Sequence, residues 1–298
     1  RLTSSSAAAI RWTCMAAGEF QVFKYAPLAF RGGRYSRYDS LPDQYHRNCI
    51  STNVVLFTDP TVPEDRGDQN SRSGLKSDHA TWDQWMRIRD RNKLDVARII
   101  DWRVGPGEAR CRADLTKAIP SSKCQRWIRE FVWLASKHLI VLDIVETKAP
   151  EIRRQWQLHV PNRPDLGDRV FTVTNRPPEQ RWYDPTIQPE NPVGRLFCQT
   201  MLPRQYNLVL HSDGKAEAYD SAGKSLGPVE GDRYHREYGH TVVQIDPSDT
   251  GKRTVFLQVL TAVDAVHSTP PDVKCKEMER GKIELTVDGA TTRLAVAE

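Results

Sequence analysis

Residues 18–60 read GEFQVFKYAPLAFRGGRYSRYDSLPDQYHRNCISTNVVLFTDP, and this stretch decides the fold. Residues 19–25 alternate apolar and polar side chains, and residues 49–57 form a mostly apolar run that stops at Asp59-Pro60. Both patterns are typical of β-strands. Between them, the seventeen residues 31–47 contain four arginines, three tyrosines and one histidine. The stretch therefore predicts two strands joined by a loop suited to an anionic ligand.

The same strand pattern dominates the rest of the chain, which predicts an all-β protein. Gly105-Pro106-Gly107 and Asp288-Gly289 are turn sequences that separate neighbouring strand patterns. About a dozen strands with short connections predict a large antiparallel β-sandwich of two packed sheets. The further predicted strands are residues 97–104, 108–115, 124–134, 138–146, 153–160, 169–174, 195–202, 206–211, 240–246, 253–263, 282–288 and 291–297.

Residues 153–160 give a sharper expectation. Trp156 and Leu158 share one face of this strand, whereas Gln157 and His159 share the other. That alternation predicts an antiparallel sheet with one wet side, on which His159 acts as a structural hydrogen-bond partner. Trp127, Trp133 and Trp156 are expected in the core.

Four segments do not follow the strand pattern. Residues 58–77 and 175–191 are rich in turn-forming residues and are expected as long surface excursions. Residues 79–93 fit a helix and, equally well, a loop or an edge strand. Residues 234–240 form a second basic aromatic cluster, read as a strand-edge loop or as an extension of a sugar-binding surface.

Composition limits the function classes. A chain of 298 residues with 39% apolar content is long enough for a substantial core, and no apolar run reaches the length of a membrane span. The net charge of +5 is a small excess and no recognition motif accompanies it, which argues against nucleic-acid binding. The six cysteines contain no Cys-x-x-Cys pair, which disfavours zinc ribbons, and Cys49, Cys124 and Cys198 are expected as buried thiols. The chain begins at Arg1 without a full signal-peptide pattern, so we expect a fragment or processed piece.

The order of the pieces in residues 18–60 resembles the C-terminal sandwich domain of the heparinase II/III family of polysaccharide lyases. The resemblance covers residues 15–265 and is carried by short motifs that are jointly specific. These are Gly18-x-Phe20, Pro27-Leu28-Ala29, Gly33-Arg34-Tyr35, Tyr45, Asn53, Asp59-Pro60, residues 113–118, residues 126–134, Val141-Leu142-Asp143 and Leu158-His159.

The resemblance implies a domain division and an activity. Residues 1–17 would be an N-terminal segment with a truncated first strand, and residues 18–298 the heparinase II/III-like β-sandwich domain. The family places its active site in the cleft between this sandwich and an N-terminal α/α toroid, which is missing from this chain. The expected function is therefore the sandwich part of a lyase that cleaves uronic-acid-containing, in some cases sulfated, glycans by β-elimination. Such a part is expected to be inactive or weakly active alone.

The chain departs from the family at its catalytic and zinc motifs. Residues 12–20 take the place of the His-x-His-x-Asp-x-Gly-x-Phe motif, and both of its histidines and the aspartate are missing. The family's three zinc-ligand positions correspond to Cys14, Arg31 and Thr52. Because arginine and threonine are not zinc ligands, no metal and no other cofactor is expected.

The candidate site is the arginine- and tyrosine-rich loop. The resemblance implies that Tyr38 and His46 are catalytic, as proton-transfer or hydrogen-bonding groups. Six further residues are expected to bind substrate, the arginines through carboxylate or sulfate: Arg34, Tyr35, Arg37, Tyr45, Arg47 and Asn53. The alternative from the residues alone is a solvated basic loop whose tyrosines pack on the sheet.

The expected partners are an acidic polysaccharide and the missing toroid domain, with no nucleic acid and no membrane span. The family's substrates imply a periplasmic or extracellular location. The competing function is a non-catalytic carbohydrate-binding or structural β-sandwich that has lost the catalytic histidines.

Overall fold

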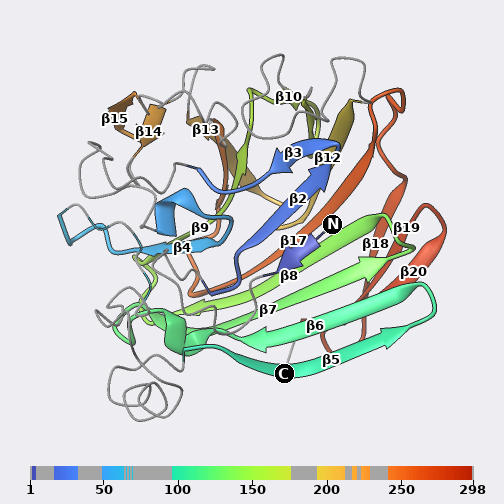
Figure 1. The fold of residues 1–298 in the computed structure, drawn as a ribbon. Coiled ribbons are helices and arrows are strands. Elements are labelled where there is room, and N and C mark those ends of the chain that lie inside the picture. The colour runs from blue at the N-terminus through green and yellow to red at the C-terminus, as the bar shows by residue number, and fades with distance from the viewer. Residues whose placement is uncertain are drawn as a thin grey trace, which may run out of the picture.

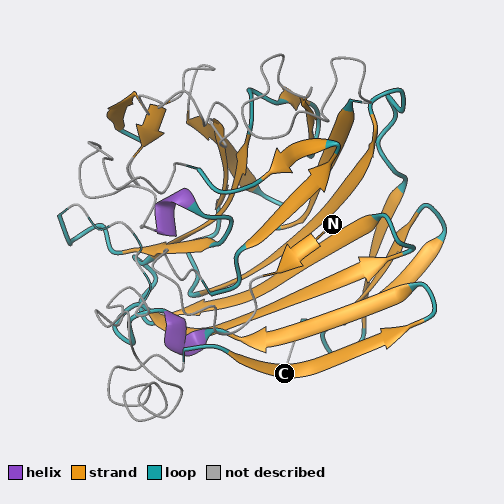
Figure 2. Ribbon diagram, viewed as in Figure 1, coloured by secondary structure: helices purple, strands orange, loops and turns teal. Residues whose placement is uncertain are grey.

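The structure is a computed structural model that describes residues 2–4, 17–32, 49–63, 65, 67, 69, 96–175, 193–211, 217–219, 223–228 and 241–296. Regular structure in these residues is β-strand except for short 3₁₀ helices such as η2 (Cys49–Ser51) and η4 (Thr116–Ala118), which confirms the all-β prediction (Figure 2). No helix among them is long and apolar enough to cross a bilayer. The predictions for residues 79–93 and 234–240 lie outside the described residues.

The strands form antiparallel sheets, of which the largest has eight strands (Figure 1). In spatial order it contains β10 (Asp165–Leu166), β11 (Val170–Asn175), β12 (Gly194–Leu202), β17 (Arg253–Asp264), β8 (His138–Thr147), β7 (Cys124–Leu134), β6 (Glu108–Asp114) and β5 (Arg98–Gly105). The second sheet contains β13 (Tyr206–His211), β16 (Thr241–Pro247), β9 (Arg153–Val160) and β4 (Val55–Thr58). The smaller sheets are β1 (Leu2–Ser4) with β2 (Phe20–Lys24) and β3 (Ala26–Ala29), β14 (Glu217–Tyr219) with β15 (Ser225–Pro228), and β18 (Val273–Met278) with β19 (Lys282–Val287) and β20 (Ala290–Ala295).

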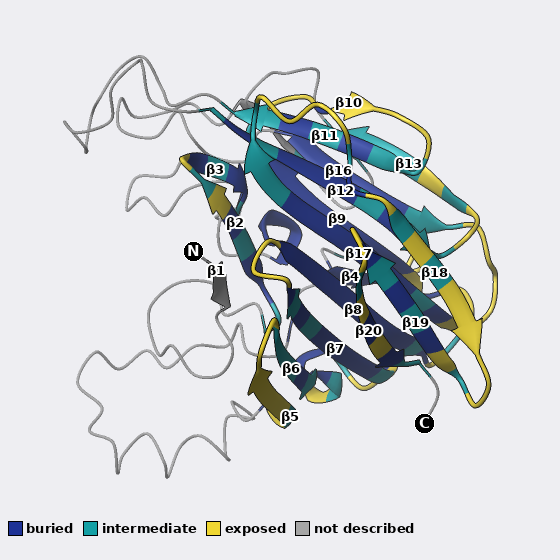
Figure 3. Cartoon of the chain, turned by 90° about the vertical axis from the view of Figure 1, so that its right-hand side faces the viewer, coloured by how far each residue is buried: buried dark blue, intermediate teal, exposed yellow. Residues whose placement is uncertain are grey.

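The eight-stranded sheet packs apolar side chains on both of its faces, and β8 shows why. Leu139, Val141 and Val145 point into a first core shared with the four-stranded sheet and with β2 and β3. Ile140 and Leu142 point into a second core against the small sheet β18–β19–β20. Because side chains alternate along a strand, the continuous apolar run of β8 fills two cores at once. The expected sandwich is confirmed, with the small sheet β18–β19–β20 as a third layer on the other face of the eight-stranded sheet (Figure 3).

Most strands lie where the sequence predicted them. The predicted strands 124–134, 153–160 and 206–211 coincide with β7, β9 and β13, and the other strands predicted after residue 96 begin within two residues of the observed ones. β18 was missed because only its Val273 and Cys275 pack toward the second core, so its sequence lacks an apolar pattern. Trp127 and Trp156 are fully buried and Trp133 is partly buried against the first core, as expected.

The prediction of one strand over residues 49–57 was wrong. Cys49–Ser51 forms η2, the chain bends over Thr52–Val54, and only Val55–Thr58 pairs, as β4 against β9. The Thr52 N–H and hydroxyl both donate to the Cys49 carbonyl, at 3.0 and 2.8 Å, which folds the backbone back on itself. A short turn therefore replaces the first half of the predicted strand.

A buried ion pair joins the two halves of the sandwich. Arg129 on β7 lies directly across from Asp143 on β8, and neither side chain is exposed. The guanidinium binds both carboxylate oxygens, Nε to Oδ1 at 2.7 Å and Nη2 to Oδ2 at 2.8 Å, and the Trp127 indole N–H donates to the same carboxylate at 2.7 Å. Arg129 Nη1 donates to the carbonyls of Gly18 at 2.6 Å and Asn53 at 3.1 Å. The pair therefore connects the central sheet to the strand and turn above it.

Gly18 makes this approach possible. Its φ is +82°, in the left-handed region that favours glycine, and a Cβ there would lie 2.6 Å from Leu115 Cδ1 and 3.3 Å from Arg129 Cδ. Any side chain at this position would push against the residues that hold the ion pair.

We predict that Asp143→Ala lowers the free energy of unfolding by about 3–5 kcal/mol, because it leaves the buried Arg129 charge without its partner. The matched control is Glu277→Ala, which removes the partner of Arg204 in a pair whose side chains are 66% and 65% exposed. The control is expected to cost at most about 1 kcal/mol. Urea unfolding followed by circular dichroism measures both, and similar losses in the two variants would contradict the role given to the buried pair.

Candidate functional site

Most predicted site residues lie in one segment outside the described residues. These are Arg34, Tyr35, Arg37, Tyr38, Tyr45, His46 and Arg47, and their roles stay predictions. The two ends of the segment are described, and they meet. The Gly32 N–H donates to the Ser51 carbonyl at 2.8 Å, and the Phe30 N–H donates to the His159 carbonyl at 3.0 Å. The described ends of the segment therefore lie next to each other, beside the end of β9.

Asn53 is the predicted site residue that the structure describes. It is fully buried, and its amide Nδ2 donates to the Phe20 carbonyl at 2.9 Å. Its Oδ1 accepts the backbone N–H of His159 at 2.8 Å and lies 3.2 Å from His159 Nδ1. Asn53 thus joins β2, the turn after η2 and β9. Its contact with substrate stays a prediction.

The predicted wet side of β9 is buried instead, which corrects that expectation. Gln155, Gln157 and His159 are each at most 2% exposed. Gln157 Nε2 lies 3.0, 3.2 and 2.6 Å from the carbonyls of Cys49, Ile50 and Thr52. The turn that contains these three carbonyls therefore covers this face of the sheet. Its inward-pointing carbonyls receive their hydrogen bonds from the Gln157 side-chain amide.

The polar face continues across the four-stranded sheet. His159 on β9, Val242 on β16 and His211 on β13 are direct neighbours in the strand register, so their side chains share one face. His211 is partly buried, and its Nε2 lies 2.7 Å from Gln244 Oε1. The Tyr219 ring lies beside the His211 ring, with 5.8 Å between centroids. Two histidines and two glutamines thus form a polar row next to the anchored segment ends.

His159 is uncharged in this setting. Burial lowers its pKa to about 3, a hydrogen bond with the Ile50 backbone opposes that shift, and the charges of Arg31 and His211 add to it. A neutral, buried imidazole bonded to Asn53 fits the structural role predicted for it. His211 is the more accessible of the two rings.

Arg31 lies at the rim of this site and pairs with Glu19. The Arg31 Nε and Nη2 atoms lie 3.3 and 3.2 Å from the two Glu19 carboxylate oxygens. Burial raises the pKa of Glu19, and the Arg31 charge opposes that rise. Arg31 and Thr52, which occupy two zinc-ligand positions of the resembling family, are thus held by an ion pair and by the Cys49 carbonyl. The described part of the chain contains no group of three side chains suited to a metal ion.

Sequence reasoning missed His211, Gln244 and the covering role of Gln157. A signal was available, since Gln155, Gln157 and His159 interrupt an otherwise apolar strand at alternate positions and Gln244 does the same in β16. Polar residues repeated on one face of two apolar strands indicate a buried polar surface when something covers it. The strand sequences alone do not indicate which segment covers that polar surface.

We predict that His159→Gln flattens the loss of stability as the pH falls from 7 to 5. The folded-state pKa of about 3 lies below the ordinary value of 6.5, so the unfolded chain takes up a proton first. The stability that neutral His159 contributes is fully present above pH 6.5, and it is lost at up to about 1.4 kcal/mol per pH unit as the pH falls toward 3. Urea unfolding at several pH values measures the slope. His267→Gln, at an exposed histidine, is the control, and equal slopes for wild type and His159→Gln would contradict the assignment.

Comparison with known proteins finds the same fold in solved structures. No family model matches the sequence, and a search of curated proteins finds no match to it. A heparinase III structure matches 98% of this chain and 38% of its own, at 12% identity and a TM-score of 0.59. Heparan sulfate lyase HepC from Pedobacter heparinus matches 95% of this chain and 37% of its own, at 12% identity and a TM-score of 0.53. A further heparinase III structure matches 98% and 37%, at 10% identity and a TM-score of 0.54.

Identities this low show the fold alone. The chain spans less than two fifths of the length of these structures, and nearly all of it is matched. The chain therefore has a β-sandwich fold that is also found in heparinase III and heparan sulfate lyase structures.

Proposed function

We propose that this chain is the β-sandwich part of a polysaccharide lyase that cleaves uronic-acid-containing glycans by β-elimination. One observation carries the proposal: the fold matches heparinase III over 98% of the chain. The described ends of the arginine- and tyrosine-rich segment also lie beside a buried polar face of that fold. The resemblance read from the sequence points to the same family and to the same segment.

The proposed chemistry requires three tasks at one uronate. The proton at C5 is weakly acidic, so a cation or hydrogen-bond donor must first neutralise the neighbouring carboxylate. A base then removes the proton, and an acid returns one to the leaving oxygen. We assign proton transfer to Tyr38 and His46, and carboxylate or sulfate binding to Arg34, Arg37 and Arg47, with Tyr35, Tyr45 and Asn53 completing the sugar contacts.

The polar face beside the described ends of the segment supports these assignments. The ends of the segment are held by Gly32, Ser51 and Phe30, and the turn that follows it is held by Gln157. Catalytic groups need a rigid base, because a small displacement from the reacting atoms lowers the rate steeply. In the proposal the opposite wall of the cleft comes from an α/α toroid domain, and the protein acts on acidic polysaccharide in the periplasm or outside the cell.

We predict that the 298-residue chain alone releases little unsaturated uronate from heparan sulfate or alginate, because the sandwich provides one wall of the cleft. Joined to a toroid domain, it is expected to release product, and Tyr38→Phe and His46→Ala are each expected to reduce the rate by at least about 100-fold. The ultraviolet absorbance of the unsaturated sugar end measures turnover.

Tyr25→Phe and His267→Ala are the matched controls, since each changes the same residue type at an exposed position. Rapid turnover by the chain alone would contradict the two-wall cleft. Undiminished turnover by both site variants in the joined form would contradict the assignment of Tyr38 and His46.

We predict that the chain binds anionic polysaccharides weakly and in a salt-sensitive way. Charges at an exposed site act over a Debye length of about 8 Å at physiological salt, so added salt weakens binding. The triple variant Arg34→Ala, Arg37→Ala, Arg47→Ala is expected to elute from immobilised heparin at lower salt than wild type. The control removes three exposed arginines elsewhere, Arg204, Arg280 and Arg293, with the same loss of charge. Equal elution of the two triple variants would show that net charge, and not this segment, determines binding.

A further inference from the structure

The edge strand β5 is exposed in an unusual way. It closes one side of the eight-stranded sheet, and seven of its eight residues are exposed (Figure 3). Trp102 and Val104 are each 69% exposed, and Ile99 and Ile100 are 44% and 38% exposed. A long edge strand with exposed apolar side chains is a template for pairing with another strand.

The two faces of β5 differ in character. Trp102 lies opposite Cys111 and then Phe131, which packs on the first core, so Trp102 extends that apolar face outward. Arg103 lies opposite Arg110 and then Val132, which belongs to the second core. One face of β5 therefore carries Trp102 and Val104, and the other carries the charged side chains of Asp101 and Arg103.

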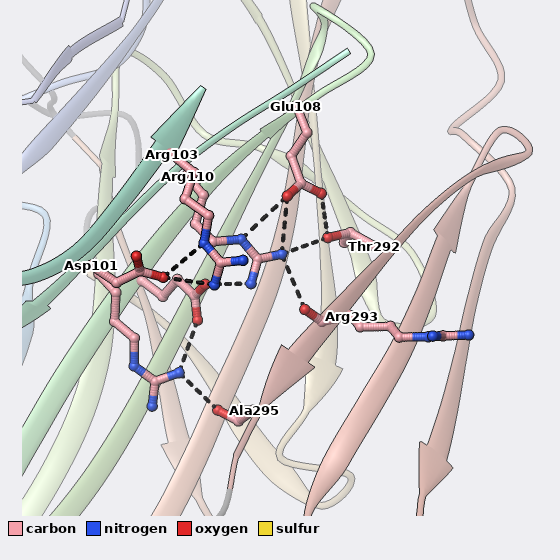
Figure 4. A network of polar contacts seen from close by, with 9 residues as sticks. Asp101, Arg103, Glu108, Arg110, Thr292, Arg293 and Ala295 are labelled. Carbon is pink, nitrogen blue, oxygen red and sulfur yellow. Dashed lines mark hydrogen bonds and ion pairs between the residues drawn. The ribbon is translucent and has the colours of Figure 1, made fainter. Parts of the chain in front are cut away.

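The charged face is ordered by a polar network. Arg103 holds Asp101 through Nε at 3.1 Å and Nη2 at 2.8 Å (Figure 4). Behind them, Arg110 bonds to Glu108 at 3.3 Å and to Thr292 on β20 at 2.9 Å. The network attaches the β5–β6 hairpin to the small third sheet. The edge strand is thus held firmly, although no described strand pairs with its outer side.

The backbone of β5 offers hydrogen bonds at matching positions. Gly105 and Glu108 close the two-residue turn at Pro106-Gly107, and the closing pair of such a hairpin is hydrogen bonded. Bonded and non-bonded pairs alternate along an antiparallel ladder. Counting back from this turn, Trp102 and Val104 fall in non-bonded pairs with β6. Their N–H and C=O groups therefore point away from β6, toward the free edge.

We propose that β5 is a dimerisation edge, at which two copies of this chain pair antiparallel about a two-fold axis through Trp102. In this register Trp102 faces Trp102 of the second copy, and Ile100 faces Val104. On the other face, Asp101 lies opposite Arg103 of the second copy, twice by symmetry. The pairing joins two eight-stranded sheets into one continuous sheet, and it does not depend on the function proposed above.

The charged side chains favour this register over the registers shifted by two residues. A shift of two residues in one direction places Arg103 opposite Arg103, and a shift in the other places Asp101 opposite Asp101. Like charges directly opposite are unfavourable, whereas opposite charges and aromatic pairs stabilise an antiparallel pair. The β5–β6 register shift between Ile99 and Asp101 limits the pairing at the other end of the strand. A second copy of the same strand is therefore the occupant whose charges and apolar side chains match.

Charge exchange between two copies tests the proposal. Sedimentation equilibrium of the 298-residue chain is expected to show a dimer that dissociates on dilution. Asp101→Arg and Arg103→Asp are each expected to be monomeric, because each places like charges opposite one another. A mixture of the two single variants is expected to form a heterodimer, since both arginines of the first variant then face the two aspartates of the second. The double variant, in which the two charges are exchanged, is expected to form a dimer again.

The mixture separates pairing between copies from the Asp101–Arg103 contact within one copy, which both single variants lose. Trp102→Lys is expected to abolish the dimer, whereas Leu166→Lys, at a 53% exposed residue on the opposite edge strand β10, leaves it intact. Circular dichroism confirms that each variant is folded. A monomeric wild-type chain, or a mixture that stays monomeric, would overturn the proposal.

Discussion

The bidentate pair between Arg129 and Asp143 is the constraint on which the rest of the structure depends. Both charges lie in the interior, where an uncompensated charge is very unfavourable, and neighbouring polar groups complete their hydrogen bonds. The Trp127 indole N–H donates to the Asp143 carboxylate, and the carbonyls of Gly18 and Asn53 accept from the Arg129 guanidinium. The ion pair therefore fixes the start of β2 and the turn after η2 relative to the central sheet.

From that constraint the polar face follows step by step. Because Asn53 is fixed by its carbonyl, its side chain can reach both Phe20 and His159. Because the turn is fixed, its inward carbonyls need a donor, and Gln157 provides it. Gln157 and His159, which a simple amphipathic strand would turn to water, are thus buried and hydrogen bonded, Gln157 through Nε2 and His159 through its backbone N–H and Nδ1. Gln157 Oε1 and His159 Nε2 have no hydrogen-bond partner among the described residues.

The sequence predicted the framework well, because strands such as β7 and β9 are indicated by local alternation and by flanking turn residues. It failed where distant residues decide the conformation. Residues 49–54 look like a strand, but the turn there is held by Gln157, more than a hundred residues away in the chain. The same separation made the polar side of β9 look exposed. His211 and Gln244 meet only through the register of β13 and β16, which no local pattern specifies. For the catalytic candidates the sequence and its resemblance remain the sole basis, since Tyr38 and His46 lie outside the described residues.

The hydrogen bond between Gly32 and Ser51 has a consequence for how such a protein can diversify. With both ends of the intervening segment fixed by the framework, the entropy of closing it depends only slowly on its length, at roughly 0.6 kcal/mol for each doubling. Changes in the length of residues 33–48 therefore alter the free energy of folding only slightly, whereas Cys49 and Ile50, at the end of the segment, belong to the first core. A framework of this kind can therefore carry segments of different length between the same two anchors at little cost to folding.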